Sequence, residues 1–231
     1  MLRVRLTAKS VALGLAFVVT CVVVDTAEAQ RGGARGRGRG PEDMVTLAAN
    51  EQVQKELAVT DEQKPQITKI AEAYRDELRQ LSSGSESLSR EERAKQRTEQ
   101  APKRQEIADK HEKELAGVLK EDQQKRLKEI TIQVQGGRAL LRPDVSAALK
   151  LSDEQKQKIK QVLDSQMERG AKVFADAQGD REALTKKLGE LRKEIDTEAV
   201  AVLNKDQQTQ FESMKGEKFE LQRAERRNRD A

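Results

Sequence analysis

The sequence is poor in the residues on which thick globular cores and most catalytic sites depend. It contains one cysteine, one histidine, one tyrosine, four phenylalanines and no tryptophan. Charged residues make up 36% of the chain and hydrophobic residues 35%. These proportions argue against a β-sandwich or a doubly wound α/β enzyme, because such folds need more apolar side chains to fill their cores. We expect an all-α chain whose long amphipathic helices bury a thin core.

The N-terminal residues have the pattern of a secretory signal peptide. Arg3, Arg5 and Lys9 precede an apolar run over 11–24, and Ala27-Glu28-Ala29 offers small residues at the positions that a signal peptidase reads. We therefore expect a signal peptide over 1–29, cleavage before Gln30, and a periplasmic or otherwise exported soluble protein. The alternative is a transmembrane anchor, but a helix over this run spans roughly 21 Å, against about 30 Å of hydrocarbon core. Because Cys21 lies within the predicted signal, the mature chain would have no disulfide.

A Gly/Arg-rich stretch follows the predicted cleavage site. Residues 31–40 contain four arginines and no acidic residue. A segment of this composition has nothing to bury, so we expect a disordered tether over 30–41. An anionic lipid or envelope polymer is the alternative partner of these arginines. Nucleic acid, the usual partner of such stretches inside a cell, is disfavoured by the export signal.

The rest of the chain contains an internal repeat. Leu57 to Ile67 recurs 92 positions later as Leu149 to Ile159, with six of eleven residues identical. Val118 to Gln124 recurs 84 positions later as Val202 to Gln208. We expect two helical units, a first repeat over 42–135 and a second repeat over 138–231.

Each recurring motif has the form of a helix start. Thr60 and Ser152 are expected N-caps whose hydroxyls accept from the helix backbone, while a glutamine three residues later reaches back to the cap. Lys120 is the weak copy, because its side chain cannot accept a hydrogen bond. The expected motif residues are Thr60, Gln63, Gln123, Ser152, Gln155, Asn204 and Gln207.

Helical periodicity follows each cap and predicts a hairpin of long helices in each repeat. The expected second helices cover about 90–119 and 181–203, with Ser89 and Asp180 as caps and an interruption at Pro102. One expected apolar stripe consists of Ile67, Ile70, Ala71, Tyr74, Leu78 and Leu81. The matching stripe consists of Ile159, Val162, Leu163, Val173, Phe174 and Ala177. A short coiled-coil-like seam is expected from Leu184, Leu188, Leu191 and Ile195.

Catalytic signatures are weak throughout. The mature chain has no cysteine nucleophile, no glycine-flanked serine elbow and only one histidine. His111 matches Ile195 in the repeat, which predicts a structural histidine on the apolar stripe rather than a metal ligand or an acid/base group. The carboxylates are interleaved with Lys and Arg, as in solvated helix pairs. We expect a protein that is not an enzyme and that uses no cofactor or metal.

The motif of an apolar residue, Thr or Ser, two residues and Gln resembles the LTxxQ-motif family of periplasmic proteins, the Spy/CpxP-like group. The matching segments are 59–63, 119–123, 151–155 and 203–207. The resemblance implies a thin curved cradle of helical hairpins that acts as an ATP-independent chaperone or envelope-stress accessory. Family members usually carry one motif pair and dimerise, so two pairs in one chain suggest an intramolecular pseudo-dimer.

A thin helical layer leaves apolar side chains uncovered, and such patches mark protein-binding surfaces. We therefore expect an exported helical protein that binds unfolded or partly folded envelope proteins, with self-association as a further expectation. A structural spacer or coiled-coil oligomer of the envelope is the alternative. The candidate client contacts are Met167, Phe174, Phe211, Met214 and Phe219, with core packing as the alternative for each.

Overall fold

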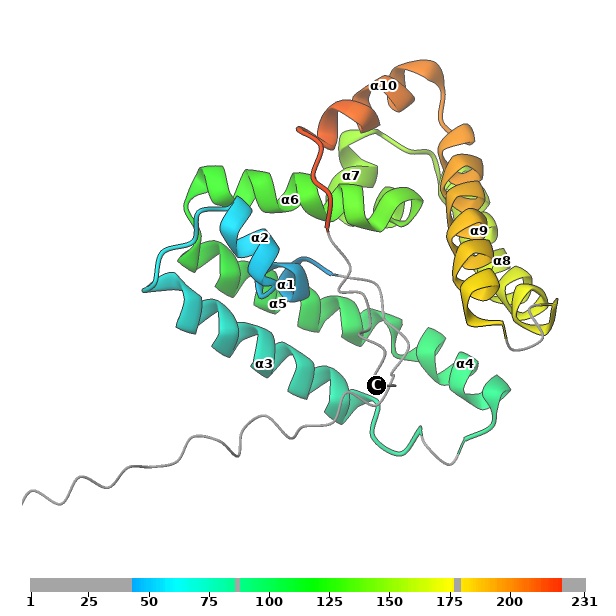
Figure 1. Ribbon diagram of the computed structural model, residues 1–231, viewed down its shortest axis with the longest axis horizontal. Helices are drawn as coiled ribbons and strands as arrows, with labels where there is room; N and C mark the ends of the chain where they lie inside the picture. Colours follow the sequence, from blue (N-terminus) through cyan, green and yellow to red (C-terminus); the bar gives the residue numbers. More distant parts are fainter. Residues whose placement is uncertain (1–42, 86–87, 177–179, 222–231) are drawn as a thin grey trace, which may run out of the picture. The chain divides into compact units, whose positions relative to one another are not determined.

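The computed structural model describes residues 43–85, 88–176 and 180–221 (Figure 1). These residues belong to one compact unit, Arg39–Ala231. The described residues form helices joined by turns and contain no strand, which confirms the all-α prediction. The predicted signal peptide and the predicted tether lie outside the described residues.

The helices follow the order that the internal repeat predicts. The first repeat contains α1 (Met44–Ala48), α2 (Glu51–Glu56), α3 (Gln63–Leu81), α4 (Arg90–Glu99), α5 (Ala101–Val118) and α6 (Glu121–Gln135). The 3-10 helix η3 (Gly136–Leu141) leads into α7 (Pro143–Ala148), α8 (Asp153–Asp176), α9 (Arg181–Ala201) and α10 (Lys205–Met214). The 92-residue offset places α2 on α7, and the 84-residue offset places the start of α6 on the start of α10.

The long helix expected over 90–119 is divided in two. Helix α4 ends at Glu99 and α5 begins at Ala101, with Pro102 in the first turn of α5. Proline has no backbone N–H, so it fits where no intrahelical donor is needed and interrupts a helix elsewhere. The predicted caps at Ser89 and Asp180 are present, and both side chains accept from backbone N–H groups of the following turn.

Two equivalent residues end α2 and α7 in a left-handed conformation. Ala58 has φ 48° and Lys150 has φ 49°. In the first repeat, Val59 N–H donates to Gln54 C=O at 3.0 Å, and Leu151 N–H donates to Ser146 C=O at 3.0 Å in the second. This is the Schellman arrangement, which usually employs glycine because a Cβ is disfavoured at positive φ. It turns the chain sharply just before each motif cap.

The buried side chains form a thin core with two main clusters. The first cluster includes Leu47, Val53, Ile67, Leu115 and Leu127, and the second includes Ile132, Leu140, Ile159 and Phe211. Helix α6 contributes to both, with Leu127 and Ile130 in the first cluster and Ile132 in the second. The chain after α10 returns to the first cluster through Phe219 and Leu221. One helix and one extended segment thus join the cores of the two repeats.

The left-handed turn gives a test of the fold. Ala58→Gly should raise the free energy of unfolding by about 0.5–1 kcal/mol, because glycine adopts positive φ without the Cβ clash. Ala73→Gly, at an exposed position inside α3, should lower it by about 1 kcal/mol through lost helix propensity. Urea unfolding of both variants measures the two effects. Destabilisation by both substitutions would contradict the left-handed geometry at Ala58.

Candidate functional site

The motif glutamines of the first repeat bind each other. The Nε2 of Gln63 donates to Oε1 of Gln123 at 2.9 Å, and the Nε2 of Gln123 donates to Oε1 of Gln63 at 3.2 Å. Their other amide hydrogens go to the opposite motif, from Gln63 to Val118 C=O at 2.7 Å and from Gln123 to Leu57 C=O at 3.0 Å. Both side chains are at least nine-tenths buried. We call this arrangement the amide clasp.

The second repeat contains the same clasp. Gln155 donates to Gln207 Oε1 at 2.8 Å, and Gln207 donates to Gln155 Oε1 at 3.3 Å. The remaining donors reach Val202 C=O and Leu149 C=O, which are the repeat equivalents of Val118 and Leu57. The motif glutamines therefore connect two helix starts as well as capping their own.

The predicted caps Ser152 and Asn204 directly precede α8 and α10, whereas Thr60 lies before the N-cap residue of α3, which is Glu62. The hydroxyls of Thr60 and Ser152 accept from the N–H of Gln63 and Gln155, and Asn204 Oδ1 accepts from Gln207 N–H. Each glutamine Oε1 in turn accepts from the backbone N–H of its cap. Gln123 accepts from Lys120 N–H at 2.9 Å, which leaves only the reverse half of the box at the lysine copy. Helix α3 itself begins at Gln63, one turn after Thr60.

The glutamine after each second motif has a function that the sequence interpretation missed. Gln124 Nε2 donates to Ala116 C=O and Leu119 C=O, both at 2.8 Å. Gln208 Nε2 reaches the equivalent carbonyls of Val200 and Leu203. Each amide thus satisfies carbonyls at the end of the preceding helix. The repeated Asp-Gln-Gln sequence was the available signal for this role.

A polar bridge joins α3 to α5 around His111, which is 1% exposed. Nδ1 of His111 lies 2.9 Å from Glu114 Oε2, and Nε2 lies 3.2 Å from Glu77 Oε1. Lys110 donates to the same oxygen of Glu77 at 2.6 Å. The hydrogen bond from Lys110, helped by His111, holds the pKa of Glu77 below its usual value. This bridge agrees with the structural role expected for His111.

Tyr74 extends this bridge toward α1. Its ring meets His111 edge-on at 5.6 Å between centroids, and its hydroxyl donates to Asp43 Oδ2 at 2.9 Å. Burial, together with the charge of Asp43, raises the pKa of Tyr74 well above its usual range, so the phenol remains a donor. Asp43 Oδ1 also accepts from Thr46 N–H at 2.8 Å, which caps α1.

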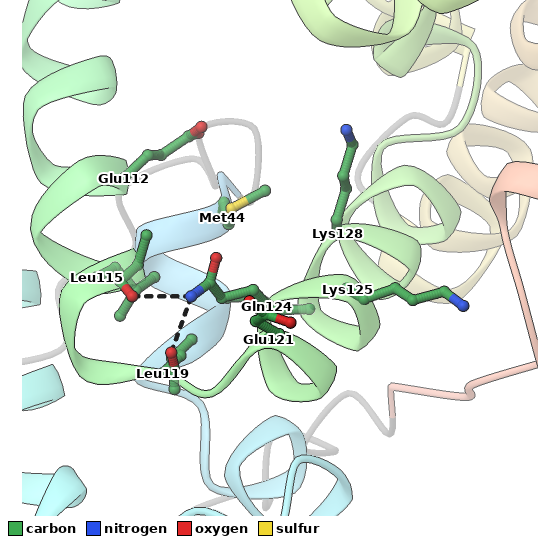
Figure 2. A pocket seen from close by; sticks show the side chains of 10 residues that line it. Met44, Glu112, Leu115, Leu119, Glu121, Gln124, Lys125 and Lys128 are labelled. Carbon is green, nitrogen blue, oxygen red and sulfur yellow. Dashed lines mark hydrogen bonds between the residues drawn. The ribbon is translucent and has the colours of Figure 1, made fainter.

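A cleft of about 380 Å³ lies between α5 and α6 (Figure 2). Its apolar lining includes Met44 of α1, Leu115 of α5, Leu119 directly after α5, and Leu127 of α6. The three leucines are at most 5% exposed, so they offer little surface to a ligand. Figure 2 shows the amide of Gln124 turned toward the end of α5, where its donors are already used.

Ion pairs connect one end of the cleft to the second repeat. Arg142 donates to both carboxylate oxygens of Glu112 at 3.3 and 3.2 Å and to Asp144 Oδ1 at 3.1 Å. Lys128 of α6 lies 2.9 Å from the other oxygen of Asp144. Burial alone would raise the pKa of Asp144, but Lys128 and Arg142 hold it below its usual value. These charges are engaged with each other, which indicates a structural joint.

The most exposed apolar side chains lie on the α8–α9 hairpin. Phe174 is 69% exposed, Met167 is 55% exposed and Leu188 is 40% exposed. Nearer the other helices the same hairpin is closed, with Ile159 at 0% and Ile195 at 1% exposure. The placement of Phe174 in a buried stripe was therefore wrong, and the predicted seam is open at Leu188. Ala177 lies outside the described residues.

Part of the α8–α9 hairpin is exposed because η3 covers only one part of it. Arg138 of η3 donates to Gln166 Oε1 at 2.5 Å, and Gly137 N–H donates to Asp196 Oδ1 at 2.9 Å. Within the described residues, no hydrogen bond from η3 reaches past Gln166 along α8. Two helices alone cannot cover both sides of an apolar seam, so Met167 and Phe174, which lie beyond Gln166, are exposed to solvent.

The predicted client contacts therefore have different environments. Met167 and Phe174 are exposed, whereas Phe211 is fully buried and is corrected to a core residue. Its ring packs among apolar side chains of the second cluster. Met214 and Phe219 are partly buried and pack against the second and first clusters respectively.

Comparison with known proteins gives no relative: no family model, curated protein or solved structure matches the chain. Within the described ranges, no helix is both long and apolar enough to cross a membrane. The same part of the chain brings together no set of three or more His, Cys, Asp or Glu side chains that could hold a metal ion.

The amide clasp can be tested by a double-mutant cycle. Gln123→Met should lower the free energy of unfolding by about 2–3 kcal/mol, because it removes the two hydrogen bonds with Gln63 and leaves the Leu57 carbonyl and Lys120 N–H without their Gln123 partner. When Gln63→Met is added to Gln123→Met, the further loss in free energy of unfolding should be at least about 1 kcal/mol smaller than the loss that Gln63→Met causes in the unmodified chain. The control pairs Gln63→Met with Gln207→Met from the other clasp, where the two losses should add. Additive losses within one clasp would show that its two glutamines act independently.

Proposed function

We propose that the chain is an exported, ATP-independent protein-binding protein that holds partly folded polypeptides, in the manner of a chaperone or envelope-stress accessory. The observation that carries this proposal is the uncovered apolar surface on α8, where Phe174 and Met167 are 69% and 55% exposed. Single exposed apolar side chains are common on protein surfaces, but exposed apolar side chains that adjoin one another mark protein-binding surfaces. The resemblance to the LTxxQ-motif, Spy/CpxP-like proteins supports the same class of function.

The α8 surface is a better candidate than the α5–α6 cleft. The leucines of the cleft are at most 5% exposed, and its charged ends are used in ion pairs. On α8, the charged neighbours stand beside the apolar side chains, as Lys172 and Glu168 pair at 3.0 Å while both remain mostly exposed. Long exposed side chains of this kind can shield an apolar surface loosely and move aside for a partner.

Export is part of the proposal and rests on the N-terminal residues. The basic start, the apolar run and the small residues before Gln30 support secretion. The rival proposal is a structural spacer of the envelope, which the length of the α8–α9 hairpin favours: α8 has 24 residues and α9 has 21. The two proposals differ in whether the exposed side chains bind other polypeptides.

A light-scattering assay separates them. Insulin aggregates when dithiothreitol cuts its disulfides, and the reductant should leave a chain starting at Gln30 unchanged because Cys21 is absent from it. We expect this chain to suppress scattering at an equimolar ratio. The double variant Met167→Ser/Phe174→Ser should lose at least half of the suppression while its stability changes by no more than about 0.5 kcal/mol per site.

The matched control is Leu141→Ser, which removes another exposed apolar side chain, 38% exposed, from η3. This variant should suppress aggregation as well as the unmodified chain does. No suppression by the unmodified chain would favour the spacer. Full suppression by the double variant would place client binding away from α8.

A further inference from the structure

The exposed apolar surface of α8 has a gap in its middle. Leu163, Met167, Gly170 and Phe174 follow one another at steps of four, three and four residues, so they share one face of the helix. We call these four residues the α8 stripe. Gly170 interrupts it between its two most exposed side chains. A Cβ built on Gly170 would meet no atom within 4 Å, so no part of the described chain fills the gap.

Glycine at this position is unfavourable for the helix itself. In a helix interior it lowers stability relative to alanine, because its backbone has more freedom to lose. Gly170 lies well inside α8 (Asp153–Asp176), and its backbone φ is not positive. No neighbouring atom comes so close to Gly170 that a side chain would be excluded there. The geometry of the described residues therefore supplies no reason for glycine here.

Residues 163–174 contain two acidic and two basic residues, and Glu194 and Glu198 of α9 add a negative excess beside the stripe. Between 163 and 174, Arg169 is held by α9 through Glu194 at 2.6 Å and Glu198 at 2.9 Å. Lys172 pairs with Glu168 at 3.0 Å. Asp164 is exposed and forms no ion pair among the described residues. The charge left over beside the stripe is thus a carboxylate, which complements a basic partner.

From these observations we propose that Gly170 forms a notch that receives one bulky apolar side chain of a partner polypeptide, with a Lys or Arg of the same segment beside Asp164. Met167 and Phe174 flank the inserted side chain along the helix. This assignment rests on the proposed function and names its binding subsite. The notch differs from a general apolar patch in one measurable respect. A side chain introduced at Gly170 would fill the notch and weaken the binding of the partner.

The test uses a Gly/Ser-based peptide of 15 residues with one central tryptophan flanked by lysines. Because the chain contains no tryptophan, the fluorescence of the peptide reports binding without background. We expect a blue-shifted emission on binding, and a dissociation constant at least fivefold higher with Gly170→Leu. A general apolar patch would bind more tightly after this change, because leucine enlarges it.

Gly189→Leu is the matched control. Gly189 lies on α9 of the same hairpin, is exposed, and also has no atom near an added Cβ. Both variants should raise the melting temperature by roughly 2–4 °C through helix propensity. Only Gly170→Leu should weaken peptide binding, and Gly189→Leu should bind within twofold of the unmodified chain.

The outcomes separate the notch from the function. Unchanged or tighter binding by Gly170→Leu would overturn the notch, and so would equal binding of a peptide with glutamates in place of the lysines. Self-association that Gly170→Leu abolishes would place a second copy in the notch and overturn the assignment to a foreign partner. If the unmodified chain neither binds the peptide nor suppresses insulin aggregation, the proposed function fails as well.

Discussion

Two pairs of glutamine side chains hold the helix starts of this protein together. In each clasp, two amides exchange hydrogen bonds and use their remaining donors on backbone carbonyls of the opposite motif. A chain with few aromatic residues has little apolar area with which to fix the crossing of its helices. A buried polar pair with all its partners present supplies that specificity, because any other arrangement would leave amides unpaired.

The repeats share their clasps and differ in how their hairpins are bridged. In the first repeat, Glu77 on α3 meets Lys110 and His111 on α5. At the positions equivalent to Glu77 and Lys110, Arg169 on α8 meets Glu194 on α9, so the sign of the bridging charge is reversed, and Glu198, the equivalent of Glu114, is the second partner of Arg169. The two repeats thus share the amide clasp where their motifs meet, while the ion pairs that bridge their helical hairpins differ. The uncovered surface lies on the hairpin of the second repeat.

Much of the frame is predictable from the sequence, because caps and periodicity are local signals. The caps at Thr60, Ser152 and Asn204 and the break near Pro102 follow from hydrogen-bonding and steric rules within a few residues. The pairing of the glutamines does not follow from such local rules, since the two partners are 60 positions apart in the first clasp and 52 positions apart in the second. The sequence was equally unable to predict that Phe174 is exposed and Phe211 is buried. Both follow helical apolar patterns, and only the reach of η3 and the packing of α10 leave one exposed and the other buried.

The proposed function requires that other polypeptides contact the part of α8 that lies beyond Gln166. Hydrogen–deuterium exchange of the chain from Gln30, with and without reduced insulin, tests it most directly. We expect slower exchange over 163–176 of α8 when insulin is present, with no change over 121–128 beside the α5–α6 cleft. Protection confined to the cleft, or no protection anywhere in the presence of insulin, would contradict it.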